Sequence, residues 1–218
     1  MGISLAASSR LKVSGLVSCR RAAGRLVPHL LGPLSAGSLQ QKRSMFEGKL
    51  GQVIGSAWLD LVDDPLVVKG FGSQLFDSEG MAARRRPIFE AGQLKTYFVD
   101  NYYGRKLKME PTTARTSNLA WKLGDKGQEA LLSDLKDGLL VTSFLGGNSN
   151  STTGDFSLGI SGFRVRGGKL AEPIAEMNLS GNHLEFWKSL VAVGNDPYPY
   201  SPLRTPTLVF EKANVAGT

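Results

Sequence analysis

A glycine pair within residues 155–180 constrains the fold more than any other feature of this sequence. The stretches DFSLGISGFRVR and KLAEPIAEMNLS are typical of strands, and Gly167-Gly168 between them predicts a hairpin turn. The chain also holds 26 glycines and ten prolines among its 218 residues. These residues favour many tight turns, so we expect short strands to outnumber long helices.

Four segments predict helices, all of them short, and one of them stands at the end of LKTYFVDNYYGRKLKM. Apolar residues recur at helical spacing over residues 23–34, where prolines and a glycine predict a short or kinked helix. Residues 126–138 predict a helix closed by Gly138. Residues 182–194 predict a helix with Asn182 as its N-cap.

Further strands are predicted between these helices. Residues 94–100 alternate and are rich in aromatic side chains, residues 139–145 follow a predicted helix, and residues 205–215 predict an edge strand. The regular alternation of strand and helix that builds parallel sheets is missing. We therefore expect an α+β fold that is rich in strands, with mostly antiparallel sheets and a few short helices.

Excess positive charge is confined to the start of the chain. Residues 47–218 carry equal numbers of basic and acidic residues, and the run RRR at residues 84–86 is short enough to be a solvated strand face. A nucleic-acid-binding domain needs a basic face, so we expect no nucleic-acid partner. Residues 1–46 contain no acid and seven basic residues, namely Arg10, Lys12, Arg20, Arg21, Arg25, Lys42 and Arg43.

Residues 1–20 leave the location of the protein open. They are rich in serine, alanine and arginine, as a mitochondrial transit peptide is, although an ordinary strand or loop could have this composition. No run approaches the roughly 18 apolar residues of a membrane-spanning helix, so we expect no membrane partner. Cys19 is the single cysteine, which rules out an internal disulfide and a multi-cysteine metal cluster.

Patterns of catalytic residues are missing from the sequence. His29 and His183 are isolated, and neither has a second histidine about one helical turn away, as a zinc hydrolase requires. No G-x-S-x-G turn supports a serine nucleophile, and nothing supports Cys19 as one. The sequence therefore predicts no catalytic and no metal-binding residue.

Two polar clusters remain as candidate binding sites. The loop GGNSNSTTGD lacks the Gly-Lys-Ser/Thr ending of a phosphate loop and precedes a strand, so it is a turn-rich connection or touches a peptide or partner. An acidic cluster could hold a cation, although caps and turns explain it equally well. The candidate loop residues are Gly146, Gly147, Asn148, Ser149, Thr153 and Asp155, and the acidic residues are Asp60, Asp63, Asp64, Asp77 and Glu79.

Several segments together resemble the C-terminal domain of the TldD/PmbA family of zinc-peptidase subunits and modulators of peptide maturation. They include GRLVPHLLGPLSAGSLQQKRSMFEGKLGQ, SQLFDSEG, LKTYFVDNYYGRKLKMEPTT and, most specifically, TGDFSLGISGFRVRGGKLAEPIAEMNLSGN. Family members carry an N-terminal α/β domain before this strand-rich domain. The resemblance implies that residues 21–218 form the C-terminal domain, that the N-terminal domain is missing, and that residues 1–20 are a poorly defined basic tract.

The resemblance also implies a role without metal. Catalytic members carry a His-Glu-x-x-x-His helix in the region that matches Arg25 to Ser35, and a cysteine ligand near the C-terminus. Here that region has one histidine and no glutamate, and GNDPYPYSPLRTPTLVF has no cysteine. The chain therefore resembles the PmbA (TldE) branch. We expect a non-catalytic subunit in a bacterial cytoplasm, with a peptide substrate and with zinc only in a TldD-like catalytic partner, and His29 as a packing residue.

Three alternatives stay open. The chain could be a stand-alone hydrolase or ligand-binding domain, it could be a truncated and non-functional fragment, and residues 1–20 could direct it to mitochondria. We also expect residues 46–215 to form the compact body, with the preceding tract poorly packed. Uncovered edges then predict self-association, or dependence on a TldD-like partner. The tract has four apolar positions from which one strand could cover such an edge: Leu11, Val13, Leu16 and Val17.

Overall fold

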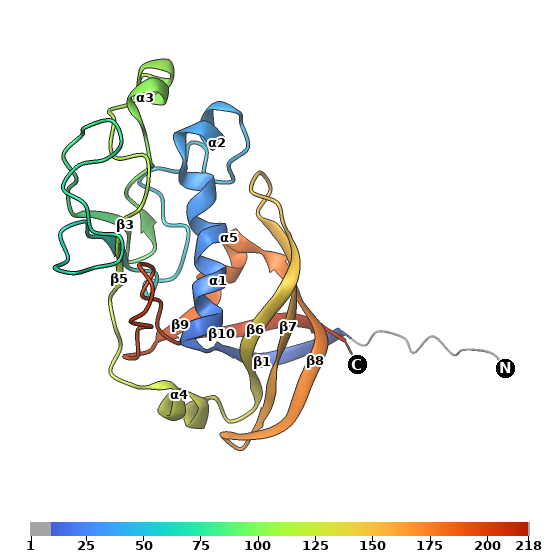
Figure 1. Ribbon diagram of the computed structural model, residues 1–218. Helices are drawn as coiled ribbons and strands as arrows, with labels where there is room; N and C mark the ends of the chain where they lie inside the picture. The colour runs from blue at the N-terminus through green and yellow to red at the C-terminus, as the bar shows by residue number, and fades with distance from the viewer. Residues whose placement is uncertain (1–9, 218) are drawn as a thin grey trace.

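The computed structural model describes residues 10–217 and shows an α+β fold whose two sheets share one large hydrophobic core (Figure 1). None of the helices in this range is long and apolar enough to cross a membrane. The helices are α1 (Arg20–Leu31), α2 (Ala36–Gln40), α3 (Asn101–Leu107), α4 (Gln128–Leu135) and α5 (His183–Phe186). The strands are β1 (Arg10–Ser18), β2 (Leu61–Asp63), β3 (Arg86–Glu90), β4 (Gln93–Leu94), β5 (Leu119–Trp121), β6 (Gly138–Ser149), β7 (Asp155–Arg166), β8 (Lys169–Asn182), β9 (Leu190–Val193) and β10 (Leu208–Ala216).

The larger sheet is a closed barrel of mixed strands. Its strand order is β1-β6-β7-β8-β10-β9, and a further pairing of β1 with β10 closes the ring. β1 runs parallel to β6, whereas its pairing with β10 is antiparallel. The prediction of mostly antiparallel sheets is wrong here, because it left out a strand from the start of the chain that joins β6 to β10.

The predicted hairpin of residues 155–180 is present as β7 and β8. Arg166 pairs with Lys169 across Gly167 and Gly168, whose φ angles are +55° and +76°. Glycine adopts such angles without the steric cost that a side chain brings, so this turn sets the register of the two strands.

The predicted poorly packed tract is instead a paired strand, β1, over residues 10–18. The strand pairs with β10 along most of its length and with β6 from Leu16 to Ser18. Leu16, Val17 and Ser18 are fully buried. Hydrogen bonds on both edges make this strand part of the barrel wall, whereas residues 1–9 lie outside the described residues.

α1 packs its apolar face into the core, as the predicted short helix at residues 23–34 requires. A 3-10 turn from Gly32 to Leu34 follows the helix directly. The opposite face carries Arg21, Arg25 and His29 at successive helical turns and runs beside β6 (Figure 1). The buried residues of the helix are Ala22, Ala23, Leu26, Val27, Leu30 and Leu31.

The smaller sheet has the order β4-β3-β2-β5 and contributes Leu61 and Phe89 to the shared core. The predicted strand at residues 94–100 is mostly wrong. Only Gln93–Leu94 pairs as a strand, and Phe98 forms a single bridge with Ser35 instead.

Two predicted element ends also differ from the structure. β10 is no edge strand, because it pairs with β1, β8 and β9. Gly138 begins β6 and does not close α4, which ends at Leu135. By contrast, the Asn182 cap is confirmed, since its side-chain oxygen accepts a hydrogen bond from the Leu184 N–H at 3.0 Å.

Candidate functional site

The two histidines of the chain meet beside α1. The ring of His29 lies 5.8 Å from that of His183 between centroids, with 22° between the planes. Phe156 stacks on His183 at 4.5 Å and 27°. His183 is only 1% exposed, so His29 packs against a buried aromatic stack.

His183 is neutral at physiological pH. Burial, helped by the charge of His29, lowers the pKa of His183 to about 4, and burial also lowers the pKa of His29. The Nε2 atom of His183 lies 2.9 Å from the Ser149 hydroxyl, whereas its buried Nδ1 has no hydrogen-bond partner among the described residues. A serine–histidine pair without a third group to orient the imidazole, and with so weak a base, lacks the arrangement of a hydrolytic triad.

The predicted loop at residues 146–155 is largely the end of a hairpin. Gly146, Gly147, Asn148 and Ser149 belong to β6 and pair with β7, so the turn itself covers only residues 150–154. The Ser149 side chain contacts the histidine pair, since its hydroxyl lies within hydrogen-bond distance of His183.

Asn182 anchors the other end of this hairpin. Its side-chain nitrogen donates to Asp155 Oδ1 at 2.9 Å and to the Thr153 carbonyl at 2.8 Å. The hydrogen bonds from Asn182 and from the Thr153 hydroxyl lower the pKa of Asp155. Thr153 and Asp155 therefore hold the hairpin, and the sequence pointed to Asn182 only as a helix cap.

The acidic cluster is structural. Asp63, 2% exposed, accepts hydrogen bonds from both the backbone N–H and the hydroxyl of Ser117 at 2.6 Å. Its other oxygen pairs with Arg86 at 3.3 Å. The Arg86 side chain is only 12% exposed, so the interpretation of residues 84–86 as a solvated strand face is wrong for this residue.

The other four acids accept hydrogen bonds from backbone N–H groups nearby. Each satisfies a turn or loop, which explains the cluster without a cation. The pairs are Asp60 with Ala91, Asp64 with Leu66, Asp77 with Glu79 and Met81, and Glu79 with Asn101.

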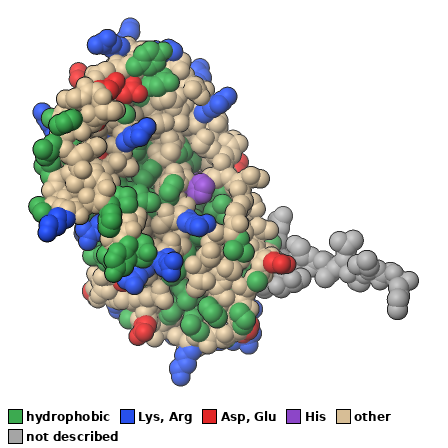
Figure 2. Space-filling view, in the orientation of Figure 1, with side chains coloured by type: hydrophobic (Ala, Val, Ile, Leu, Met, Phe, Trp, Pro, Cys, Tyr) green, Lys and Arg blue, Asp and Glu red, His purple; other side chains and the backbone are tan. Residues whose placement is uncertain are grey.

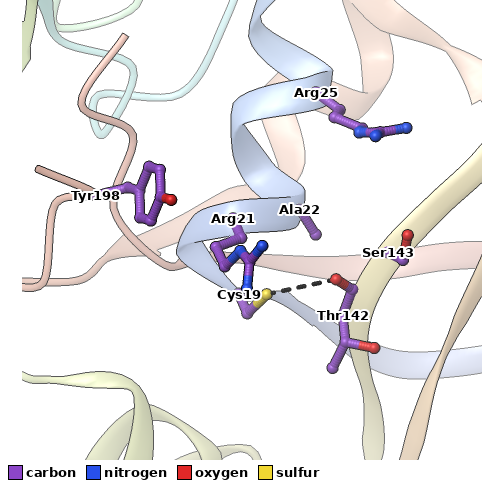
Figure 3. Close-up of a pocket in the computed structure, with 7 residues that line it drawn as sticks. All are labelled: Cys19, Arg21, Ala22, Arg25, Thr142, Ser143 and Tyr198. Carbon is purple, nitrogen blue, oxygen red and sulfur yellow. Dashed lines mark hydrogen bonds between the residues drawn. The ribbon is translucent and has the colours of Figure 1, made fainter. Parts of the chain in front are cut away.

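A groove lies between α1 and the open edge of β6. β1 covers this edge only from Leu139 to Val141, and no strand of the described residues pairs with it from residue 142 to residue 149. A hollow of about 560 Å³ opens at this place (Figure 3). Its lining residues are Cys19, Arg21, Ala22, Arg25, Thr142, Ser143 and Tyr198.

The groove is basic, and side chains, not a strand, contact two carbonyls of its β6 edge. Arg25 donates from Nη1 to the Phe144 carbonyl at 3.1 Å, and the Cys19 thiol lies 3.8 Å from the Thr142 carbonyl. Figure 2 shows basic side chains, in blue, close to the histidine at the surface of this face. The groove was not predicted from the sequence, although Arg21, Arg25 and His29 are spaced along one helical face.

The donor set beside α1 does not fit the three-ligand zinc site of catalytic TldD/PmbA members. His29 and His183 are the only histidines, and the Nε2 of His183 is engaged by Ser149. Across residues 10–217 no three His, Cys, Asp or Glu side chains are grouped so that they could hold a metal ion. The absence of a zinc cofactor nevertheless stays a prediction.

Sequence comparison settles the family. Residues 16–217 match the family described as the PmbA/TldA metallopeptidase C-terminal domain. The chain belongs to this family. The PmbA/TldA match begins inside β1, at the fully buried Leu16.

Curated PmbA relatives agree with this assignment. The metalloprotease PmbA of Escherichia coli O157:H7 is 32% identical over 194 residues, which are 88% of this chain and 43% of the relative. The metalloprotease PmbA homolog of Haemophilus influenzae is 33% identical over the same shares of the two chains. The chain thus spans less than half the length of these relatives.

Two solved structures share the fold. A Bacteroides thetaiotaomicron protein, named for modulation of DNA gyrase, has a TM-score of 0.93 at 43% identity, covering 97% of this chain and 48% of its own. TldE from Thermococcus kodakarensis has a TM-score of 0.87 at 23% identity, covering 96% and 51%, and supports the fold alone.

Proposed function

We propose that this chain is the peptide-binding, non-catalytic part of a PmbA/TldD-type metallopeptidase. The observation that carries the proposal is the edge of β6, which pairs with no strand of the described residues from residue 142 to residue 149 and faces α1 across the hollow at Thr142 and Ser143. Unpaired strand edges recruit extended segments, because such a segment satisfies the free N–H and C=O groups. The names of the relatives, all metalloproteases, supply the enzyme class.

The local chain conformation suits an added strand. Gly146 and Gly147 carry no side chain at the end of the edge, so a peptide backbone can approach closely. Both have φ near +130°, and a Cβ at Gly147 would lie 2.1 Å from the Ser157 carbonyl oxygen. Glycine at residue 147 is therefore required for β6 to pair with β7 at this position.

The catalytic step belongs to a partner in this proposal. The residues beside α1 lack a zinc donor set, and His29 and His183 are stacked together instead. A TldD-like subunit would supply the zinc, and the β6 edge would hold the peptide in an extended conformation for it. The assembly would work in a bacterial cytoplasm.

Backbone methylation of a peptide tests the added strand. We expect a short fluorescent peptide of serine, threonine and valine to bind the purified chain. Methylating the amide nitrogens of one set of alternate residues should abolish binding, because those N–H groups point at β6. Methylating the other set should leave the dissociation constant unchanged, since those groups point away. Fluorescence polarisation measures both, and equal binding of the two methylated peptides would contradict the proposal.

A further inference from the structure

We propose that the hollow beside β6 binds carboxylates of the extended peptide, so that acidic peptides are the preferred ligands. This inference rests on the proposed function, because it assigns a charge preference to the same groove. The volume of about 560 Å³ falls within the range of ligand-binding sites. It leaves room for side chains of a bound peptide next to the β6 backbone.

The positive charge of the hollow is not balanced by the chain itself. Two arginines and no carboxylate line the hollow. Arg21 forms no ion pair within residues 10–217, and Arg25 donates only to the Phe144 carbonyl. Arg86, in contrast, pairs with Asp63. An arginine presents five N–H donors in a planar fork that matches a carboxylate, so most donors at this wall are free for a ligand.

The spacing of the two arginines matches that of an extended peptide. Figure 3 shows Arg25 directed from α1 toward β6 and Arg21 beside Cys19 at the start of the helix, and both line the hollow. Four residues along a helix span about 6 Å, and two residues along a strand span about 6.6 Å. A strand added to β6 would place alternate side chains on the α1 side of the groove. A Glu-x-Glu sequence would therefore set one carboxylate opposite each arginine.

Competing sources of negative charge fit the groove less well. Nucleic acid would need a wide basic face, whereas two arginines line this hollow. The polar edge of β6 requires donors and acceptors that alternate at strand spacing, which a peptide backbone supplies. An acidic peptide satisfies both the backbone and the arginines at once.

Fluorescence polarisation on the intact chain tests this inference with matched peptides. A peptide containing Glu-x-Glu should bind about tenfold more tightly at low salt than its Gln-x-Gln counterpart. One charge-assisted hydrogen bond changes a dissociation constant by about this factor. The advantage should disappear in Arg21→Gln and Arg25→Gln. It should persist in Arg105→Gln, which removes an exposed arginine from α3, away from the groove. Amidating the C-terminus of each peptide tells whether the bound carboxylate is a side chain or the chain end.

The outcomes separate the inference from the proposed function. Equal binding of the acidic and amide peptides would overturn the charge preference and leave the strand-edge proposal standing. Absence of binding by every peptide would overturn both. Displacement of the bound peptide by a single-stranded oligonucleotide, lost in Arg21→Gln and Arg25→Gln, would also overturn the preference, because it would assign the arginines to another class of ligand.

Discussion

Replacing Asp63 with alanine is expected to lower the free energy of unfolding by about 3–5 kcal/mol, the cost of removing one partner of a buried ion pair. The substitution leaves the Arg86 guanidinium, 12% exposed, without its counter-charge. It also removes the acceptor of the Ser117 N–H and hydroxyl. Burial already lowers the pKa of Arg86, and Asp63 opposes that effect, so the charged arginine depends on this carboxylate.

Urea denaturation of the intact chain measures this loss, with Glu90→Ala as the matched control. Glu90 lies on β3 of the same sheet and pairs with Lys95 at 3.0 Å, but the Glu90 side chain is 59% exposed. An exposed pair contributes at most about 1 kcal/mol, so the control should change stability little. A loss for Asp63→Ala no larger than that for Glu90→Ala would show that the buried network is not required.

Stability should fall steeply between pH 6.5 and pH 4 because of His183. Its pKa is about 4 in the folded chain and 6.5 in the unfolded chain, so the unfolded chain binds more protons within this window. The contribution of His183 to stability is therefore complete above the pKa that it has in the unfolded chain. It is lost as the pH falls toward the pKa that it has in the folded chain. A difference of this size corresponds to about 3 kcal/mol.

Urea denaturation across this pH range, on the wild type and on His183→Gln, isolates the effect from the carboxylates. We expect the variant to have a shallower slope, whatever its absolute stability. His29→Gln should make the loss of stability over this pH range slightly smaller, because the charge of His29 is a second cause of the lowered pKa of His183. Identical slopes for wild type and His183→Gln would contradict this explanation.

The fold was predictable where its determinants are close in sequence. The β7–β8 hairpin follows from Gly167 and Gly168, and the α5 cap follows from Asn182. β1 was not predictable in this way, because its partners lie on β6 and β10, more than a hundred residues away. Without those partners, residues 10–18 look like a basic tract.

The candidate site shows the same division. The sequence predicted a polar loop that includes Ser149. Its contact with His183 was not predictable, because the pairing of β6, β7 and β8 brings these two residues together. Arg25 was not predicted as a binding residue, because its position beside Phe144 depends on how β6 packs against α1. The sequence also does not tell whether the arginines at residues 84–86 are exposed. The structure decides this for Arg86, because it forms a buried ion pair with Asp63.

Amide hydrogen exchange, measured by NMR with and without saturating acidic peptide, tests the central claim most directly. We predict that amides on the open edge of β6, within residues 142–149, gain protection when the peptide binds. Amides of β7 should change little, because they are already paired within the barrel. Protection that appears only on another surface, or no change at residues 142–149 despite peptide binding, would contradict the assignment of this edge as the peptide site.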